Sequence, residues 1–136
     1  MDVRAEEEVT ARTGTELIEA ATNTLNNLRL SEKAKEFVVA SITTLVETEA
    51  KVHNEAVEKV HLHEAASVDT LADIIGSAAA LEDLNLFTGT KIYSTPVAVG
   101  GGLFRFSHGT VSSPAPATIE ILRSKEFPMA PRDRGK

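Results

Sequence analysis

The chain of 136 residues contains no cysteine and no tryptophan, and only one tyrosine. Without cysteine it can form no disulfide bond, thiolate zinc site, iron–sulfur cluster or cysteine nucleophile. Any metal ion must therefore be bound by histidine and carboxylate side chains. Aromatic residues make up only 4% of the chain, which also argues against a stacking platform for sugars or bases.

Positive charge is in short supply as well, because 14 Lys and Arg face 20 Asp and Glu, giving a net charge of -6. A nucleic-acid-binding protein needs a basic face that displaces counterions from phosphates, so we expect no nucleic-acid partner. No apolar run approaches the roughly 18 residues of a membrane span. The acidic first 13 residues lack the apolar stretch of a signal peptide. We therefore expect no membrane association and a cytoplasmic location.

Apolar residues recur at helical spacing in two stretches, residues 16–28 and 32–52. Thr15 and Ser31 precede them as N-cap candidates. The core stripe expected for the first helix is Leu17, Ile18, Ala21, Leu25 and Leu28. For the second helix it is Ala34, Phe37, Val38, Ile42, Leu45 and Val52.

A third helix is predicted over residues 68–85, with Ser67 as its N-cap. Apolar side chains surround this segment almost completely, so we expect it to be the buried central helix. Gly76 would weaken a helix interior by about 1 kcal/mol, and close packing is the expected reason for its presence.

The rest of the chain favours short strands. Strands are expected over residues 57–63, 91–99 and 103–107, and a short helix over 117–123 follows Pro116. Helices that precede strands predict an α+β fold, with helices packed on a small mixed sheet in a single domain. That domain would cover residues 14–128, between a loose lead-in (1–13) and a flexible basic tail (129–136).

The strongest chemical cluster joins two histidines to two aspartates. Residues two apart on a strand face the same side, so His61 and His63 would aim both imidazoles at one point. Asp69 and Asp73 lie one turn apart on one helix face. Imidazole suits nickel, zinc, copper and iron, and carboxylates suit harder ions, so the cluster predicts a site for a divalent metal without specifying which. The alternative is structural: aspartates that cap amides or pair with lysines, and half-buried strand histidines.

A second cluster combines glycines with a histidine. Gly100, Gly101 and Gly102 would let backbone amides approach an anion such as phosphate. They match neither a P-loop nor a dinucleotide fingerprint, and a hairpin turn or bulge is the alternative. His108 could be a third imidazole for the metal, a donor to phosphate or a loop histidine. His53 lies at the end of the second helix, where a histidine cation would interact favourably with the helix dipole, so a capping role is expected.

Two blocks of the chain together resemble one known family. Val-His-Leu-His-Glu at 60–64, followed by residues 68–69 and 73–76, is similar to the signature of the nickel insertion proteins of the lactate racemase cofactor. These proteins are also called pyridinium bisthiocarboxylate mononucleotide nickel chelatases. The second block agrees in the same order, and its matching positions are residues 92–96, 100–102, 108–109 and 114–118. Residues 47–53 also resemble the family segment before the histidine motif, and the similarity extends from about residue 15 to about residue 128.

The resemblance implies CTP-dependent insertion of nickel into a sulfur-bearing pyridinium mononucleotide, a lyase-class chelatase reaction. Its metal-handling positions would be His61, His63, Glu64, Asp69, Asp73 and His108. Its loop for an anion or nucleotide substrate would be Gly100, Gly101 and Gly102. Without cysteine, nickel would rest on nitrogen and oxygen ligands of the protein, and the substrate would supply sulfur.

Family members are much longer, and their opening Gly-Ile-Ser-Gly-Asp-Met segment and C-terminal domain have no counterpart here. We therefore expect the chain to handle nickel as part of a chelatase system with a separate C-terminal chain, rather than to use CTP alone. The absent opening strand would leave a sheet edge that invites self-association into a homo-oligomer. The competing hypotheses are a non-catalytic interaction module that joins the missing domains and a small metal-dependent hydrolase.

Overall fold

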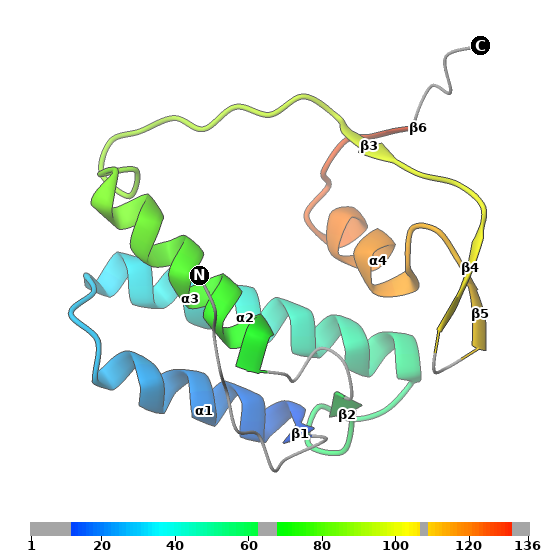
Figure 1. The fold of residues 1–136 in the computed structure, drawn as a ribbon, viewed down its shortest axis with the longest axis horizontal. Coiled ribbons are helices and arrows are strands. Elements are labelled where there is room, and N and C mark those ends of the chain that lie inside the picture. Colours follow the sequence, from blue (N-terminus) through cyan, green and yellow to red (C-terminus); the bar gives the residue numbers. More distant parts are fainter. Residues whose placement is uncertain (1–11, 63–67, 107–108, 132–136) are drawn as a thin grey trace. The chain divides into compact units, whose positions relative to one another are not determined.

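The computed structural model describes residues 12–62, 68–106 and 109–131. The chain divides into two compact units, Met1–Thr90 and Lys91–Lys136. In the described residues, the first unit is mainly helical and the second combines short strands with one helix (Figure 1). The predicted α+β class is confirmed.

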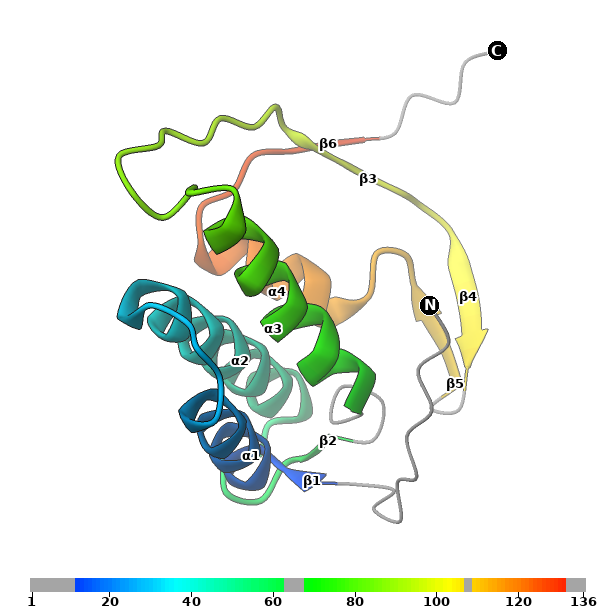
Figure 2. The same ribbon diagram turned by 60° about the vertical axis from the view of Figure 1, so that its left-hand side comes forward.

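The first unit is built on helices α1 (Gly14–Asn26), α2 (Glu32–His53) and α3 (Val68–Asp83). Helix α2 contacts both of the others and lies between them (Figures 1 and 2). The predicted helices over 16–28, 32–52 and 68–85 are thus confirmed to within two residues at each end. Among the described residues, none of the helices combines the length and apolar character needed to cross a membrane.

Helix α1 begins where a reciprocal pair of hydrogen bonds fixes its first turn. The Glu16 N–H donates to Thr13 Oγ1 (3.3 Å), and the Thr13 N–H donates to Glu16 Oε2 (2.7 Å). This capping box satisfies two backbone donors that a helix end leaves open. The prediction of Thr15 as N-cap is therefore wrong. The prediction of Ser31 for α2 is confirmed, because its Oγ accepts from the Ala34 N–H (3.3 Å).

Helix α2, rather than α3, is the central helix of the first unit. Of the α3 residues only Leu71 and Ala78 are buried, and Leu84, just beyond its end, is 66% exposed. The prediction failed because apolar residues on every side of a helix do not reveal which sides meet a neighbour. The core consists of Leu17, Ala21, Leu25, Val38, Ile42, Val46, Ala50, Val60, Leu62, Leu71 and Ala78. Phe37 and Val52 of the expected stripe are about 40% and 39% exposed.

Two glycines behave in opposite ways. At Gly14 an added Cβ would overlap Val46 Cγ1 and lie 2.7 Å from the Val57 carbonyl oxygen. The Gly14 N–H also donates to the Val60 carbonyl (3.2 Å), so the start of α1 lies directly on the segment after α2. At Gly76 an added Cβ would meet nothing within 4 Å, so the expectation of close packing there is wrong.

The strands β1 (Arg12–Thr13) and β2 (His61–Leu62) pair antiparallel beside the start of α1. Strand β2 is shorter than the predicted strand over residues 57–63, because turns occupy residues 57–59. Strand β1 falls inside the lead-in that was expected to be loose. Its other residues, 1–11, lie outside the described part of the chain.

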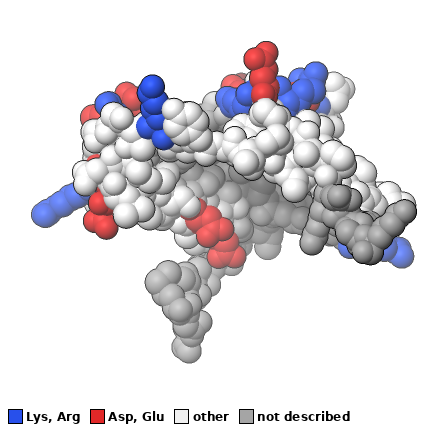
Figure 3. All heavy atoms as spheres, turned by 90° about the horizontal axis from the view of Figure 1, so that it is seen from above, with Lys and Arg blue, Asp and Glu red and all other residues white. Residues whose placement is uncertain are grey.

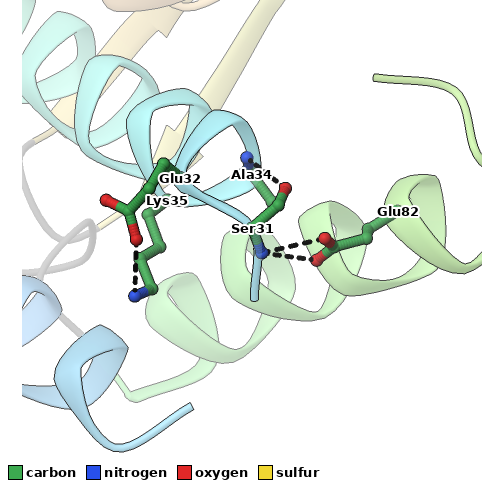
Figure 4. Close-up of polar contacts among 5 residues, drawn as sticks. All are labelled: Ser31, Glu32, Ala34, Lys35 and Glu82. Atoms are coloured by element: carbon green, nitrogen blue, oxygen red, sulfur yellow. Dashed lines mark hydrogen bonds and ion pairs between the residues drawn. The ribbon is translucent and has the colours of Figure 1, made fainter. Parts of the chain in front are cut away.

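The end of α3 is fastened to the start of α2 by a carboxylate (Figure 4). The Ser31 N–H donates to Glu82, with nitrogen–oxygen distances of 2.8 Å to Oε1 and 3.2 Å to Oε2. Just beyond α3, the Phe87 ring meets the Phe37 ring of α2, with centroids 5.6 Å apart and planes at 59°. A charge-assisted bond and a tilted aromatic pair thus both join this end of α3 to the first turns of α2.

The second unit contains two short two-stranded sheets and helix α4. Strand β3 (Val97–Val99) pairs in parallel with β6 (Met129–Pro131), and β4 (Leu103–Phe106) pairs antiparallel with β5 (Gly109–Ser112). Helix α4 (Pro116–Ser124) has Pro116 in its first turn, as predicted. The described strands therefore pair in three two-stranded sheets, counting β1–β2, where one small mixed sheet was expected.

Several strand predictions need correction in the second unit. The strand expected over 91–99 is confined to Val97–Val99, directly after Pro96, whose nitrogen cannot donate to a ladder. Strand β5 replaces a predicted loop, because it pairs with β4 across a short connection. Strand β6 occupies the first residues of the expected flexible tail. Its partner β3 is far away in sequence, so no local pattern indicated it.

We predict opposite effects of the same substitution at the two glycines. Gly14→Ala should lower the free energy of unfolding by about 1–3 kcal/mol, because the new methyl group has no room. Gly76→Ala should raise it by roughly 0.5–1 kcal/mol, because alanine loses less backbone entropy in a helix. Urea denaturation followed by circular dichroism measures both. A Gly14→Ala protein as stable as the wild type would contradict the close approach.

We predict that Glu82→Ala lowers the free energy of unfolding by about 1 kcal/mol, because it leaves the Ser31 N–H without its charged acceptor. Asp83→Ala is the matched control, since Asp83 is exposed and is the next residue along α3. Equal stabilities of the two variants in thermal denaturation would argue against the link.

Candidate functional site

His61 lies on the outer face of the β1–β2 pair. It is exposed, whereas the next residue, Leu62, is 2% exposed and belongs to the core. The prediction that His61 and His63 face one side requires such an exposed–buried alternation, because every second side chain of a strand faces the same side. His63 and Glu64 lie outside the described residues.

Asp69 and Asp73 occupy the first two turns of α3, and both are exposed. Asp69 lies in the first turn, where the helix dipole stabilises a carboxylate. Within residues 12–62, 68–106 and 109–131, no three histidine or acidic side chains gather closely enough to hold a metal ion. The predicted site also needs His63, Glu64 and His108, which lie outside these ranges, so it stays a prediction.

The sequence pattern missed one carboxylate near His61. Thr13 and His61 are direct partners in the β1–β2 pair, and Thr13 Oγ1 donates to Glu16 Oε2 (3.0 Å). These bonds from the backbone and hydroxyl of Thr13 are the main reason why the pKa of Glu16 lies below its usual value. The charges of His61 and Arg12 lower this pKa further, and partial desolvation opposes them. The Thr-x-x-Glu capping pattern could have found the cap, but not its position beside His61.

His53 contacts a carboxylate on its own helix. Its Nε2 lies 3.5 Å from Glu49 Oε2, one turn earlier on α2. The C-cap residue is Asn54, which adopts the left-handed conformation with φ of 53°. His53 therefore lies in the last turn of α2, but the expected capping role belongs to Asn54.

The glycine run, residues 100–102, connects β3 to β4 in the second unit. These two strands pair with β6 and β5 rather than with each other, so the run is not a hairpin turn. All three glycines are exposed, and Gly102 has a φ of 115°, which favours glycine. The Ser113 N–H donates to the Gly102 carbonyl (2.9 Å). The loop is thus held to the residues after β5 and keeps an accessible backbone.

Charged side chains of both signs lie near one another on the face drawn in Figure 3. This mixture agrees with the excess of only six negative charges in the sequence.

Comparison with known proteins decides the family. A family model described as "Nickel insertion protein" matches residues 1–135. The chain belongs to the nickel insertion protein family. The resemblance carried by the histidine motif and the glycine-containing block is confirmed.

Relatives in this family include bacterial and archaeal proteins. A "Pyridinium-3,5-bisthiocarboxylic acid mononucleotide nickel insertion protein" of Staphylococcus saprophyticus is 40% identical over 111 residues, which cover 82% of this chain and 27% of the relative. A protein of the same name from Clostridium kluyveri is 37% identical over 100 residues, 74% of this chain and 24% of the relative. A Methanothermobacter thermautotrophicus protein is 48% identical over 86 residues, which cover 63% of this chain and 20% of the relative. No solved structure matches the chain.

The matched region is therefore a small part of each relative. The chain spans about a quarter of the length of the relatives that it matches. The names of these proteins describe the activity of the whole polypeptide, of which this chain represents one segment.

We predict that Thr13→Ala moves the pKa of Glu16 part of the way back towards its usual value. The substitution removes the hydroxyl donor but leaves the backbone bond, which is the larger cause. Because the native pKa is depressed, the stability that Glu16 contributes is present above the unfolded pKa and is lost as the pH falls through the folded pKa. A pH titration of the Glu16 side-chain carbon by NMR measures the shift, and an unchanged pKa would contradict the hydroxyl bond.

Proposed function

We propose that this chain binds nickel and contributes to its insertion into a pyridinium-3,5-bisthiocarboxylic acid mononucleotide, as one part of a chelatase system. The observation that carries the proposal is the family match over residues 1–135. The substrate is taken from the names of two relatives.

The chemistry of the exposed residues fits a metal that is cargo rather than a permanent cofactor. His61, Asp69 and Asp73 are all exposed, so a substrate could reach an ion held there. Imidazole nitrogen suits nickel, and carboxylate oxygen is a harder ligand. Insertion would then be a ligand exchange, in which sulfur atoms of the substrate replace protein nitrogen and oxygen atoms around the ion. We propose that His63, Glu64 and His108 complete this donor set.

We propose a separate role for the glycine run. The exposed backbone at residues 100–102 could donate hydrogen bonds to the phosphate of the mononucleotide. We assign the use of CTP to the polypeptide that relatives carry beyond the matched segment, because this chain covers only 27% of the Staphylococcus saprophyticus protein.

We predict that the purified chain binds nickel in a calorimetric titration, and that His61→Ala combined with His63→Ala abolishes the binding. A parallel titration with zinc tests how strongly the site prefers one metal. His53→Ala is the matched control, because it also removes an exposed imidazole, from the last turn of α2.

An unchanged isotherm for the double variant would overturn the assignment of the histidines. A wild-type chain that binds no metal, yet associates with the remaining part of a family protein in size-exclusion chromatography, would favour the non-catalytic interaction module.

A further inference from the structure

We propose that Glu16 is a further ligand of the nickel ion, bound through its free carboxylate oxygen beside the imidazole of His61. This inference rests on the proposed function. It adds to the site a residue from the first turn of α1, which none of the sequence motifs contains.

The first step of the argument is the strand pairing. Thr13 and His61 are direct partners in an antiparallel pair. Side chains of such partners stand on the same face, with Cβ atoms about 4.5–5.5 Å apart. Leu62, the next residue, is buried in the core, so the shared face of Thr13 and His61 is the outer one.

The second step is the position of the carboxylate. Glu16 Oε2 accepts from both the backbone N–H (2.7 Å) and the hydroxyl (3.0 Å) of Thr13. These two bonds hold the carboxylate against Thr13, on the face where the His61 ring stands. Both bonds use Oε2, so Oε1 takes no part in the capping box.

The third step is the separation that two ligands of one ion require. An imidazole nitrogen and a carboxylate oxygen that share an ion stand roughly 3 Å apart, since each bond is about 2.1 Å long. The Glu16 carboxylate is bonded to Thr13, the cross-strand partner of His61, so the two groups can reach this separation by rotation about side-chain bonds.

A capping role alone would explain why position 16 is acidic, and the substitution Glu16→Gln separates the two roles. Glutamine serves as well as glutamate at this position of a capping box, but its neutral amide is a poor nickel ligand. The matched control is Glu19→Gln, which removes the same charge one turn later from an exposed position of α1.

The experiment is a calorimetric titration of the full chain and of each variant with nickel chloride. We expect Glu16→Gln to weaken nickel binding by at least about tenfold, since loss of even an outer-shell partner of a metal ligand typically costs that much. Glu19→Gln should leave the affinity within about twofold. The helical circular dichroism signal of the metal-free variants should equal that of the wild type. Wild-type affinity in Glu16→Gln would overturn the inference while leaving the proposed function intact.

A second measurement on the wild-type chain does not depend on how the variant folds. In an NMR titration, substoichiometric paramagnetic nickel should broaden the side-chain carboxylate carbon of Glu16 and leave that of Glu19 sharp. Equal line widths for the two carbons would overturn the inference. A chain that binds no nickel at all would instead overturn the proposed function.

Discussion

The close approach of α1 to α2 at Gly14 is the constraint on which the described part of the first unit depends. With no side chain at this position, the helix begins in contact with Val46 and the Val57 carbonyl, and the Gly14 N–H bonds to Val60. That contact sets β1 beside β2, which places Thr13 opposite His61. The geometry of the proposed metal face therefore follows from a packing contact in the core beneath it, since the same pairing buries Leu62 and exposes His61.

The sequence predicted the helices well because their signals are local. Apolar spacing and the Ser31 cap gave α2 nearly to the residue. The start of α1 shifted because a complete Thr-x-x-Glu box outweighs a lone threonine two residues later. The role of α3 could not be predicted in this way. Its apolar residues fit any buried helix. The burial of Leu71 and Ala78 and the bond from Ser31 to Glu82 show which side is packed.

In the candidate site, too, features set by neighbouring residues could be predicted from the sequence, whereas contacts between distant residues could not. The predicted strand at His61 exists, and its alternation exposes His61 and buries Leu62. The approach of Glu16 to His61 joins positions far apart in the sequence, so no motif contains it. The pairing of β6 with β3 was not predicted for the same reason, because about 30 residues separate the two strands in the sequence. Helical periodicity and caps are thus readable from the chain, whereas cross-strand neighbours emerge with the tertiary structure.

The parallel pairing of β3 with β6 has a consequence for how the second unit is connected. Each strand has three residues, so the polypeptide enters β3 and leaves β6 at points separated by about one short strand length, roughly 10 Å. Residues 97–131 therefore begin and end on two paired strands, so the two ends of this segment lie close together. A segment with this connectivity can lengthen, shorten or be exchanged between proteins without shifting the chain on either side, because the spacing of its two ends is set by one ladder. Pairing β3 with β6 closes a longer loop of chain than pairing β4 with β5. The β3–β6 pair therefore costs more loop-closure entropy.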